Sequence, residues 1–314
     1  MVYSSVAIII VNWNNYDETI DCLKSLKKLV YKKFKIFIVD NGSSNDSVSY
    51  LKNYCSKQVN ENLSFELMET GKNLGFAGGN NIAIRKALKE KFEFVWLLNN
   101  DTVVEPMSLT ELVKIMLDDQ QVGVSGSKIY YYNNPNRIWF AGGNINTWTG
   151  KASHIGYQEV DKGNLYRETT EVGYITGCSM LIRMDVIQQI GALPEYYFLY
   201  YEETEFNLMT KKRGWKIVFV PSSKIYHKAS SSTGGENSAS PMVNYYFLRN
   251  QFWLIYKTQP FFKYYICYIY ILLKGLKRIV VILRHDKKNR WENVKAIFKA
   301  LYDACRLRHC TKKG

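Results

Sequence analysis

The sequence has few cysteines, and none of them form close pairs. The six cysteines are scattered over 314 residues, without the spacing of a zinc site or the density of a small disulfide scaffold. This distribution favours a reducing compartment. No secretory signal precedes the first predicted strand, because the apolar run at residues 6–11 leads directly into polar Asn12. We therefore expect a protein on the cytoplasmic side of the cell membrane.

Long hydrophobic runs and two familiar phosphate-binding patterns are also absent. The longest uncharged stretch in the last sixty residues, Tyr264 to Leu273, has 10 residues, which is too short to span a bilayer. A glycine-rich turn is expected at residues 75–81, and it matches neither the P-loop pattern nor the dinucleotide-binding pattern GxGxxG. A transmembrane helix in this tail, a P-loop ATP site and a Rossmann dinucleotide site are therefore disfavoured.

Positive charge is concentrated at the C-terminal end. The net charge is +14, and residues 257–314 hold 15 Lys and Arg against 3 Asp and Glu, whereas residues 1–256 hold 27 against 25. A basic segment attracts anionic lipid and nucleic acid through the same electrostatics, so its charge alone does not identify the partner. Of the whole chain, 46% of residues are apolar or aromatic, which is enough for a sizeable core.

Apolar runs alternate with helical patterns in the first half of the chain. Four runs have the continuous apolar character of buried strands: residues 6–11, 34–39, 65–68 and 94–98. Helices are predicted between them, and Ser108 with Glu111 is expected to form a capping box for the next helix. This alternation indicates an α/β fold with a mostly parallel sheet flanked by helices.

From about residue 122 the predicted strands become shorter and lie among aromatic turns. A strand that turns into a helix is expected at residues 180–190, and three acids from Glu202 onward open another helix. Other strands are expected at residues 122–129, 138–140, 172–176 and 215–220, the last of which would end at Pro221.

The basic tail has the pattern of two amphipathic helices. In a helix over residues 263–284, five basic side chains share one face and seven apolar ones share the opposite face. A second amphipathic helix is expected at residues 291–302. Such helices suit an anionic membrane surface, although packing against the main domain is the alternative for each. Nucleic acid is not expected as a partner, because Tyr265 and Tyr268 lie opposite the basic face instead of within it.

Polar side chains follow the predicted strands at the points where the strands end. Because the carboxyl ends of parallel strands meet at one edge, these side chains would surround a crevice for a nucleotide. Asp40 would accept from the base, backbone amides near Gly78 and Gly79 would approach the ligand, and Asp101 would offer oxygen to Mg²⁺ or Mn²⁺. The residues expected to line this nucleotide-binding crevice are Asn12, Asn14, Asp40, Gly75, Gly79, Asn80, Asn99 and Asn100.

Six motifs in order resemble the family 2 glycosyltransferases of the GT-A fold, particularly their rhamnosyltransferase-like branch. They are Val-Asn-Trp-Asn at 11–14, Val-Asp-Asn-Gly-Ser at 39–43, Asn-Leu-Gly-Phe-Ala-Gly-Gly-Asn at 73–80, Leu-Leu-Asn-Asn-Asp at 97–101, Thr-Gly-Cys-Ser-Met-Leu at 176–181 and Phe-Leu-Tyr-Tyr-Glu-Glu at 198–203. The resemblance implies a GT-A domain over residues 1–256. Its nucleotide-binding half would be 1–121 and its acceptor-binding half 122–256, followed by a membrane-associating helical tail at 257–314.

The resemblance also implies an inverting transfer of a sugar, with rhamnose a candidate, from a dTDP- or UDP-sugar to a glycan or lipid-linked acceptor. A carboxylate would take the proton from the acceptor hydroxyl, and a divalent metal would stabilise the departing diphosphate. The family's catalytic aspartate is replaced here by Glu203, with Glu202 beside it. The extra methylene moves the carboxylate by roughly one ångström, which can be costly. A non-catalytic sugar-nucleotide or glycan-binding protein at the membrane is therefore the alternative.

The metal ligands implied by the resemblance are Asp101 and His227. The family's Asp-x-Asp motif begins with Asn99 here, so Asn99 and Asn100 are expected to contact the donor instead of the metal. His227 stands where relatives carry a histidine near the diphosphate, and a satisfied structural histidine is the alternative.

Three more residues are assigned by the resemblance. Arg249 would pair with the diphosphate as a fork of donors, with an ordinary salt bridge as the alternative. Gly177 and Cys178 match the stretch that lines the acceptor side. The loops at residues 133–167 and 230–241 are expected to decide which acceptor is used.

Overall fold

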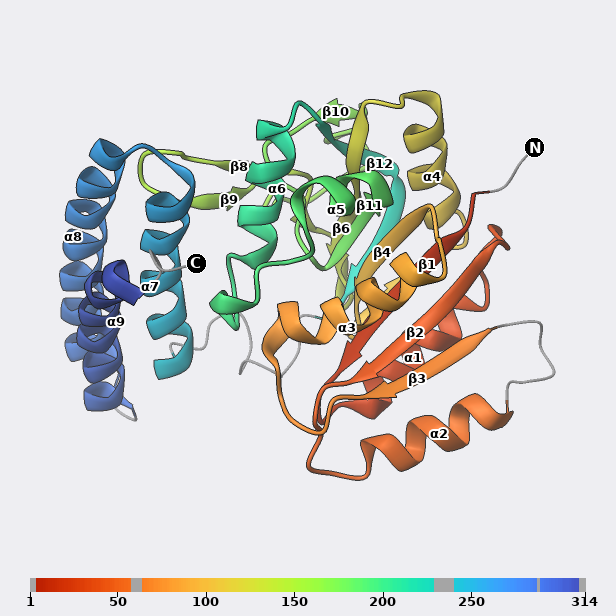
Figure 1. The fold of residues 1–314 in the computed structure, drawn as a ribbon, viewed down its shortest axis with the longest axis horizontal. Coiled ribbons are helices and arrows are strands. Elements are labelled where there is room, and N and C mark those ends of the chain that lie inside the picture. The colour runs from red at the N-terminus through yellow and green to blue at the C-terminus, as the bar shows by residue number, and fades with distance from the viewer. Residues whose placement is uncertain (1–3, 58–63, 229–239, 287–288, 311–314) are drawn as a thin grey trace.

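The computed structural model describes residues 4–57, 64–228, 240–286 and 289–310. Its centre is one ten-stranded mixed sheet, whose main path runs β10-β12-β6-β11-β4-β1-β2-β3. Helices cover both faces of this sheet, and three further helices form a bundle at one end of the molecule (Figure 1). The predicted α/β class is confirmed.

The N-terminal half is a parallel sheet with intervening helices, as predicted. Its elements are β1 (Val6–Asn12), α1 (Tyr16–Leu26), β2 (Phe34–Asp40), α2 (Ser47–Lys57), β3 (Phe65–Glu69), α3 (Gly75–Lys89) and β4 (Phe94–Asn99). Strands β1, β2, β3 and β4 pair in parallel, and the register aligns Asn12 with Asp40 and Val11 with Asn99. The three strand ends expected to carry polar site residues therefore do meet at one edge.

The second half extends this sheet with antiparallel and parallel strands. Its elements are β5 (Thr102–Val104), α4 (Ser108–Asp118), β6 (Val122–Tyr131), β7 (Asn134–Phe140), β8 (Gly143–Ile145), β9 (Ala152–His154), β10 (Thr170–Glu171), β11 (Ser179–Arg183), α5 (Met184–Ile190), the 3₁₀ turn Glu195–Tyr197, α6 (Glu202–Lys212) and β12 (Lys216–His227). Strand β11 lies antiparallel between β4 and β6, and β12 runs parallel to β6.

Two strand predictions in this half are wrong. Strand β12 does not end at Pro221 but continues to His227, across a register shift between Val220 and Lys224, and a proline is tolerated at such an irregularity. Residues 172–176 form only a single bridge, from Tyr174 to Gly143. Their backbone is satisfied differently, because the Asn207 side chain both donates to and accepts from the backbone of Ile175.

Two predictions about helix starts also need correction. Ser108 does not cap α4, because its hydroxyl donates to the Lys224 carbonyl at 2.5 Å and α4 has no side-chain cap. Residues 75–81 are not a turn but the beginning of α3. Gly78 packs against Leu74, and Gly79 packs against Val11 and Asn41. These glycines allow close packing of α3.

The C-terminal bundle contains α7 (Pro241–Thr258), α8 (Phe261–His285) and α9 (Arg290–Cys310). The two helices predicted in the tail are confirmed as α8 and α9, and α7 packs against both and against α6. Side chains from all three helices form a second hydrophobic core, which includes Tyr197 and Tyr201 from the segment before α6. Among the described residues, no helix has the length and apolar character required to cross a membrane.

The faces of α8 differ from the prediction of one apolar and one basic side. Cys267, Ile271 and Ile282 are buried in the bundle, and the opposite face is apolar as well. We call this second face the outer stripe; its side chains are 40 to 63% exposed and comprise Phe262, Tyr265, Ile266, Ile269, Leu273, Leu276, Val280 and Leu283. Two of the basic residues bond to α7 instead of forming the solvent face, since Lys274 donates to Gln251 and Arg278 to Asn244.

Candidate active site

Asn12 and Asp40 organise the strand ends at the carboxyl edge of the sheet. The Asn12 amide donates to Asp40 Oδ2 at 2.8 Å, and its oxygen accepts from the Thr19 hydroxyl at 2.8 Å. Asp40 also accepts from the Ser43 backbone amide and hydroxyl. Both predicted donor residues are buried, and their polar atoms bond to each other and to the loops. Thr19 and Ser43 were not singled out from the sequence, although Ser43 lies within one of the motifs.

Asn14 connects the loops that follow β1 and β2. It adopts a positive φ of 56°, its backbone amide donates to the Ser43 hydroxyl at 2.8 Å, and its side-chain oxygen accepts from the Ser44 amide at 2.7 Å. Asn14 is exposed, so this residue remains open to a ligand while it holds the two loops together.

The start of α3 is held by Asn41, for which no role was predicted from the sequence. The Asn41 side chain donates to the Gly75 carbonyl and accepts from the Leu74 amide. Gly75 has a φ of +74°, and a Cβ atom there would lie 2.1 Å from the Phe198 carbonyl oxygen. That carbonyl accepts from the Phe76 amide at 3.0 Å. Glycine at position 75 therefore lets the segment before α6 approach the start of α3.

Asn80 lies in the second turn of α3 in a buried position. Its amide donates to the Phe76 carbonyl at 2.9 Å, which is a bond within the helix. Gly79 lies under the Asn41 side chain. The roles of Asn80 and Gly79 in donor binding stay predictions.

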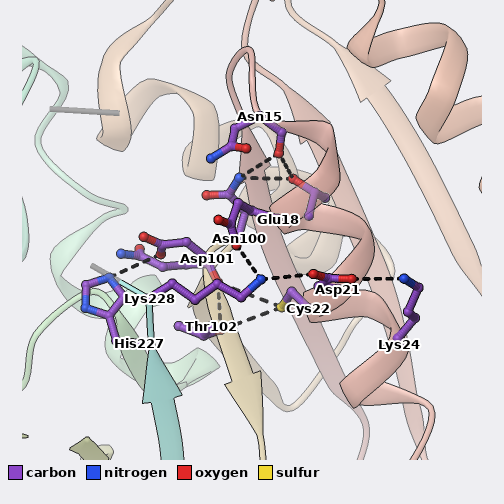
Figure 2. A network of polar contacts seen from close by, with 12 residues as sticks. Asn15, Glu18, Asp21, Cys22, Lys24, Asn100, Asp101, Thr102, His227 and Lys228 are labelled. Atoms are coloured by element: carbon purple, nitrogen blue, oxygen red, sulfur yellow. Dashed lines mark hydrogen bonds and ion pairs between the residues drawn. The ribbon is translucent and has the colours of Figure 1, made fainter. Parts of the chain in front are cut away.

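The neighbouring side chains of Asn100 and Asp101 point in different directions (Figure 2). The Asn100 amide turns toward α1 and donates to the Thr19 hydroxyl at 3.0 Å. The backbone of Asn99 joins β4 to the segment before β11, because its amide donates to the Cys178 carbonyl at 3.0 Å. Asp101 instead faces β12, the strand that carries His227.

Asp101 and His227 form a buried pair. Asp101 Oδ1 lies 3.2 Å from His227 Nε2, and both residues are less than 10% exposed. The pair exists because β12 continues past Pro221, so that His227 pairs with Thr102 in β5. The other ring nitrogen of His227, Nδ1, is buried and has no hydrogen-bond partner among the described residues.

Lys228 fastens the end of β12 to α1, and sequence reasoning missed it. Its backbone amide donates to the Asp101 carbonyl at 2.9 Å, and its ammonium group pairs with Glu18 at 2.5 Å and Asp21 at 3.0 Å (Figure 2). These bonds of Lys228 hold the backbone at Asp101 and the end of β12 after His227 in place relative to α1. Most of the loop expected at residues 230–241 lies outside the described residues.

The donor set of Asp101 and His227 fits a divalent cation. Carboxylates and imidazoles are both ligands of divalent metal ions in proteins. Here the two groups contact each other in a buried setting. Within the described part of the chain, no group of three His, Cys, Asp or Glu side chains could hold a metal. A cation at this pair would therefore complete its coordination with oxygens of the ligand and with water.

Aromatic side chains connect His227 to the other end of the site. The Trp139 ring lies edge-on to His227 at 4.5 Å and to His154 at 4.8 Å, and His154 stacks near Tyr174. Burial, together with the nearby His227, lowers the pKa of His154 to about 4 despite its bond to the Trp139 carbonyl. His154 is therefore neutral at physiological pH. Trp139 and His154 fall in the 133–167 region expected to decide the acceptor, but neither was predicted individually.

Glu202 and Glu203 begin α6 in different environments. Glu203 is half-buried and its Oε1 accepts from the Tyr174 hydroxyl at 3.1 Å. Burial raises the pKa of Glu203, while its own backbone amide and Tyr174 oppose the increase. Glu202 is 2% exposed, and its Oε2 has no partner among the described residues. Burial and the charge of Glu203 hold the pKa of Glu202 well above its ordinary value.

Gly177 and Cys178 connect the glutamates at the start of α6 to the polar end of β4. A Cβ atom on Gly177 would lie 3.8 Å from Glu203 Cβ and 2.9 Å from the Phe76 ring. The carbonyl of the next residue, Cys178, bonds to the amide of Asn99. The structure therefore brings together the residues predicted as base, acceptor contacts and donor contacts.

Arg249 has a setting that neither predicted alternative describes. Its guanidinium donates to the carbonyl of Tyr197 at 2.8 Å and to the side-chain oxygens of Asn250 and Tyr245. It also lies over three aromatic rings, including Trp253 at 4.6 Å. These partners are neutral, so the ordinary salt bridge is not found among the described residues. Pairing with a diphosphate stays a prediction.

A family model described as Glycosyl transferase family 2 matches residues 7–191, which is more than half of the chain. The chain belongs to glycosyl transferase family 2. The resemblance identified from the six motifs is thereby confirmed. The matched span contains most of the predicted donor side, with Gly177 and Cys178, but stops before Glu203 and His227.

Two relatives of this family 2 chain are named as transferases, and one solved structure has a similar fold. It is 27% identical over 210 residues to the low-salt glycan biosynthesis hexosyltransferase Agl10 of Haloferax volcanii, covering 64% of this chain and 60% of that protein. It is 36% identical over 63 residues to the N-acetylglucosaminyl-diphospho-decaprenol L-rhamnosyltransferase of Mycobacterium tuberculosis, covering 20% of each. The chain therefore spans less than two thirds of the length of these relatives.

The solved structure is the mannosyltransferase PcManGT of Pyrobaculum calidifontis in complex with GDP-Man and Mn²⁺. It aligns with a TM-score of 0.60 at 14% identity, covering 100% of this chain and 89% of that one. At this identity the likeness establishes the fold, and the predicted GT-A architecture is confirmed.

Proposed function

We propose that the protein is an inverting, metal-dependent glycosyltransferase that moves a sugar from a nucleotide-sugar to a hydroxyl of a lipid-linked or surface glycan. The observation that carries this proposal is the convergence of two features at one sheet edge. These are the buried pair of Asp101 with His227 and the carboxylate of Glu203, with Gly177 and Cys178 between them. The activities named for the two relatives support the same class of reaction.

Glu203 is the proposed base, and Glu202 its buried neighbour. A general base must be ionised and must reach the acceptor hydroxyl. Glu203 is half-buried and oriented by Tyr174, whereas Glu202 is almost fully enclosed. The pKa of Glu202 is raised more strongly than that of Glu203. Glu202 would therefore stay protonated, and the single negative charge of the pair would lie on Glu203. Burial that raises the pKa of Glu203 also makes its carboxylate a stronger base.

Asp101 and His227 are the proposed ligands of Mg²⁺ or Mn²⁺. When bound, the metal supplies positive charge that stabilises the leaving diphosphate. The solved mannosyltransferase with GDP-Man and Mn²⁺ supports this choice of cofactor. The chain's own contribution is to hold both ligands rigidly, through the pairing of β12 with β5 and the ion pairs of Lys228 with α1.

The proposed donor is a dTDP- or UDP-sugar, with rhamnose as a candidate sugar. The donor side would comprise the polar strand ends and the start of α3: Asn12, Asn14, Asp40, Gly75, Gly79, Asn80, Asn99 and Asn100, with Arg249 as a diphosphate partner. The relative that supports rhamnose is the N-acetylglucosaminyl-diphospho-decaprenol L-rhamnosyltransferase. Its acceptor is also attached to a lipid, which agrees with a lipid-linked acceptor here.

The proposed site of action is the inner face of the cell membrane, to which the outer stripe of α8 would bind. Helix α8 contains five basic residues and no acidic residue, so its charge favours anionic lipid. A row of aliphatic and aromatic side chains that are 40 to 63% exposed suits insertion at the level of the headgroups. The occupant we propose is therefore an anionic bilayer surface, and no role is proposed for nucleic acid.

Flotation with vesicles tests the membrane proposal. The full chain should float with vesicles that contain phosphatidylglycerol, and Leu273→Asp in the outer stripe should weaken this binding at least tenfold. Leu117→Asp is the control, because Leu117 is also an exposed leucine but lies on α4. Absence of flotation, or a dimer that Leu273→Asp dissociates, would show that the stripe does not bind lipid.

The first test of the transferase is release of nucleotide from a panel of UDP-, dTDP- and GDP-sugars with Mn²⁺ or Mg²⁺. We expect metal-dependent release from one donor, at least a hundredfold slower in Asp101→Ala and unchanged in Asp118→Ala, an exposed aspartate of α4. Glu203→Gln should bind this donor normally but lose transfer to an acceptor. Donor binding with no turnover by the wild type would favour the non-catalytic binding protein instead.

A further inference from the structure

The segment that leads into α6 has an unusual backbone. Between the 3₁₀ turn Glu195–Tyr197 and α6, three residues other than glycine adopt positive φ angles: Phe198 at 68°, Tyr200 at 66° and Tyr201 at 79°. Such angles are uncommon for bulky residues and persist where surrounding contacts enforce them. Tyr201 directly precedes α6, so this segment determines where Glu202 and Glu203 begin.

The Asn250 side chain of α7 bonds to the backbone carbonyl groups of this segment. The Asn250 amide donates to the carbonyl of Leu199 at 2.8 Å and that of Tyr200 at 2.9 Å, and lies 3.3 Å from that of Tyr197. Asn250 is fully buried. The segment lies in no sheet, so these contacts replace the backbone partners that regular structure would provide.

Arg249 orients this amide. Its Nε donates to Asn250 Oδ1 at 2.8 Å, which directs the NH₂ group of Asn250 toward the segment, and its Nη2 donates to the Tyr197 carbonyl at 2.8 Å. Because the guanidinium is buried among aromatic rings, it has little freedom to move. The two neighbouring side chains therefore act as one clamp.

The opposite side of the segment is held by the donor side of the fold. The Phe198 carbonyl accepts from the Phe76 amide at the start of α3, where Gly75 permits the close approach. The segment is consequently held between the start of α3 and α7. Helix α7 also lies beside α6, the helix that this segment begins (Figure 1). Tyr174 holds only the carboxylate end of Glu203, whereas the clamp holds the backbone from which Glu203 projects.

We infer that Asn250, oriented by Arg249, is a positioning residue for the transfer reaction: it keeps residues 197–201 in the conformation that places Glu203 beside Gly177 and within reach of the Tyr174 hydroxyl. This inference rests on the proposed function, because it takes Glu203 as the base. It also gives the C-terminal bundle a role in catalysis, since α7 belongs to that bundle. Loss of the clamp would impair proton removal and leave donor binding intact.

The test compares Asn250→Ala with Asn244→Ala in the full chain. Asn244 is the matched control, because it is also a buried asparagine of α7, but its amide donates to Asn293 of α9 at 2.8 Å. Turnover, KM for the donor, donor affinity, thermal stability and the pH profile would be measured for both variants. We expect Asn250→Ala to lower kcat at least tenfold with donor affinity within twofold of wild type, and Asn244→Ala to leave kcat within twofold.

The pH profile separates positioning from general destabilisation. Burial raises the pKa of Glu203, so release of the segment would admit water and lower it. The acid limb of kcat should therefore move to lower pH in Asn250→Ala and stay in place in Asn244→Ala. An unchanged kcat, or equal losses of kcat and donor affinity in the two variants, would overturn the inference.

Two further variants keep the test decisive. If Asn250→Ala does not fold, Asn250→Asp takes its place, because aspartate has nearly the same shape and can still accept from Arg249 but has no NH₂ group to donate to the carbonyls of Leu199 and Tyr200. Lower kcat with unchanged donor affinity supports the clamp, and unchanged kcat overturns it. Glu203→Gln isolates the premise: if this variant keeps full transfer, the proposed base is wrong. If Glu203→Gln is inactive while the clamp variants are fully active, only the inference fails.

Discussion

Removal of one hydroxyl group, by Tyr174→Phe, should change how the transfer depends on pH. Tyr174 donates to Oε1 of Glu203 at 3.1 Å from a buried position. This bond favours the ionised carboxylate and opposes the effect of burial, which raises the pKa of Glu203. Without the donor the pKa of Glu203 rises further, so the base is protonated over a wider range of pH.

The size of the effect follows from the bond that is lost. A hydrogen bond to a charged group contributes about 1.5–3 kcal/mol, and each 1.36 kcal/mol corresponds to a factor of about ten. Below the acid limb of the profile, kcat/KM should fall roughly ten- to a hundredfold. We expect the lower end of this range, because Glu203 is only half-buried and water can partly replace the hydroxyl. At alkaline pH the difference should become small.

The assay is a series of kcat/KM measurements across pH, with donor affinity measured in parallel. Tyr166→Phe is the matched control, since Tyr166 also donates a hydroxyl to a glutamate, Glu159, at 3.0 Å, but in an exposed setting. It should leave the profile unchanged. The reasoning would be refuted if the acid limb of Tyr174→Phe stayed in place or moved to lower pH.

Two further predictions concern the framework around the site. Lys128→Met should lower the free energy of unfolding by about 3–5 kcal/mol in urea denaturation. The variant leaves Asp161 charged and buried without the Lys128 ammonium, whose Nζ lies 2.5 Å from Asp161 Oδ2. A loss below about 1 kcal/mol would contradict this expectation. Burial opposes ionisation of Asp161, but bonds from Lys128 and other donors outweigh it and hold its pKa below the usual range. The stability from this pair is therefore present above the ordinary aspartate pKa and should be lost as pH falls below it. Gly75→Ala should reduce both stability and turnover more than Gly71→Ala; both glycines have positive φ, but only at Gly75 would the new Cβ meet the Phe198 carbonyl. Equal losses in the two variants would mean that this contact does not matter.

The polar edge of the sheet could be predicted from the sequence for a simple reason. Apolar runs such as residues 6–11 and 94–98 are buried on both faces of a parallel sheet, and each run ends at the same edge. The residues after those runs, including Asn12, Asp40 and Asp101, must then be neighbours. Six motifs in order added the family, which the family model confirmed for residues 7–191.

Other parts of the site depend on contacts that leave no local pattern. The continuation of β12 past Pro221 requires pairing with β5 and β6, and this pairing brings His227 to Asp101. Tyr174 contacts Glu203 across 29 positions of the chain, in a segment that was wrongly predicted as a strand. The contacts of Arg249 with the Tyr197 carbonyl and aromatic rings could not be foreseen either, because a motif indicates which residue is present but not which partner it meets.

The sequence by itself determined the order of strands and helices, the polar residues at the strand ends and the membership of the family, because these follow from local periodicity and from motifs. Only the tertiary structure decided which faces of the tail helices are covered. Helix α8 is apolar on two sides, and a helical period cannot tell which side faces α7 and α9 and which becomes the outer stripe. The position of the proposed base was likewise decided by packing, since α7 holds the carbonyls that precede Glu203.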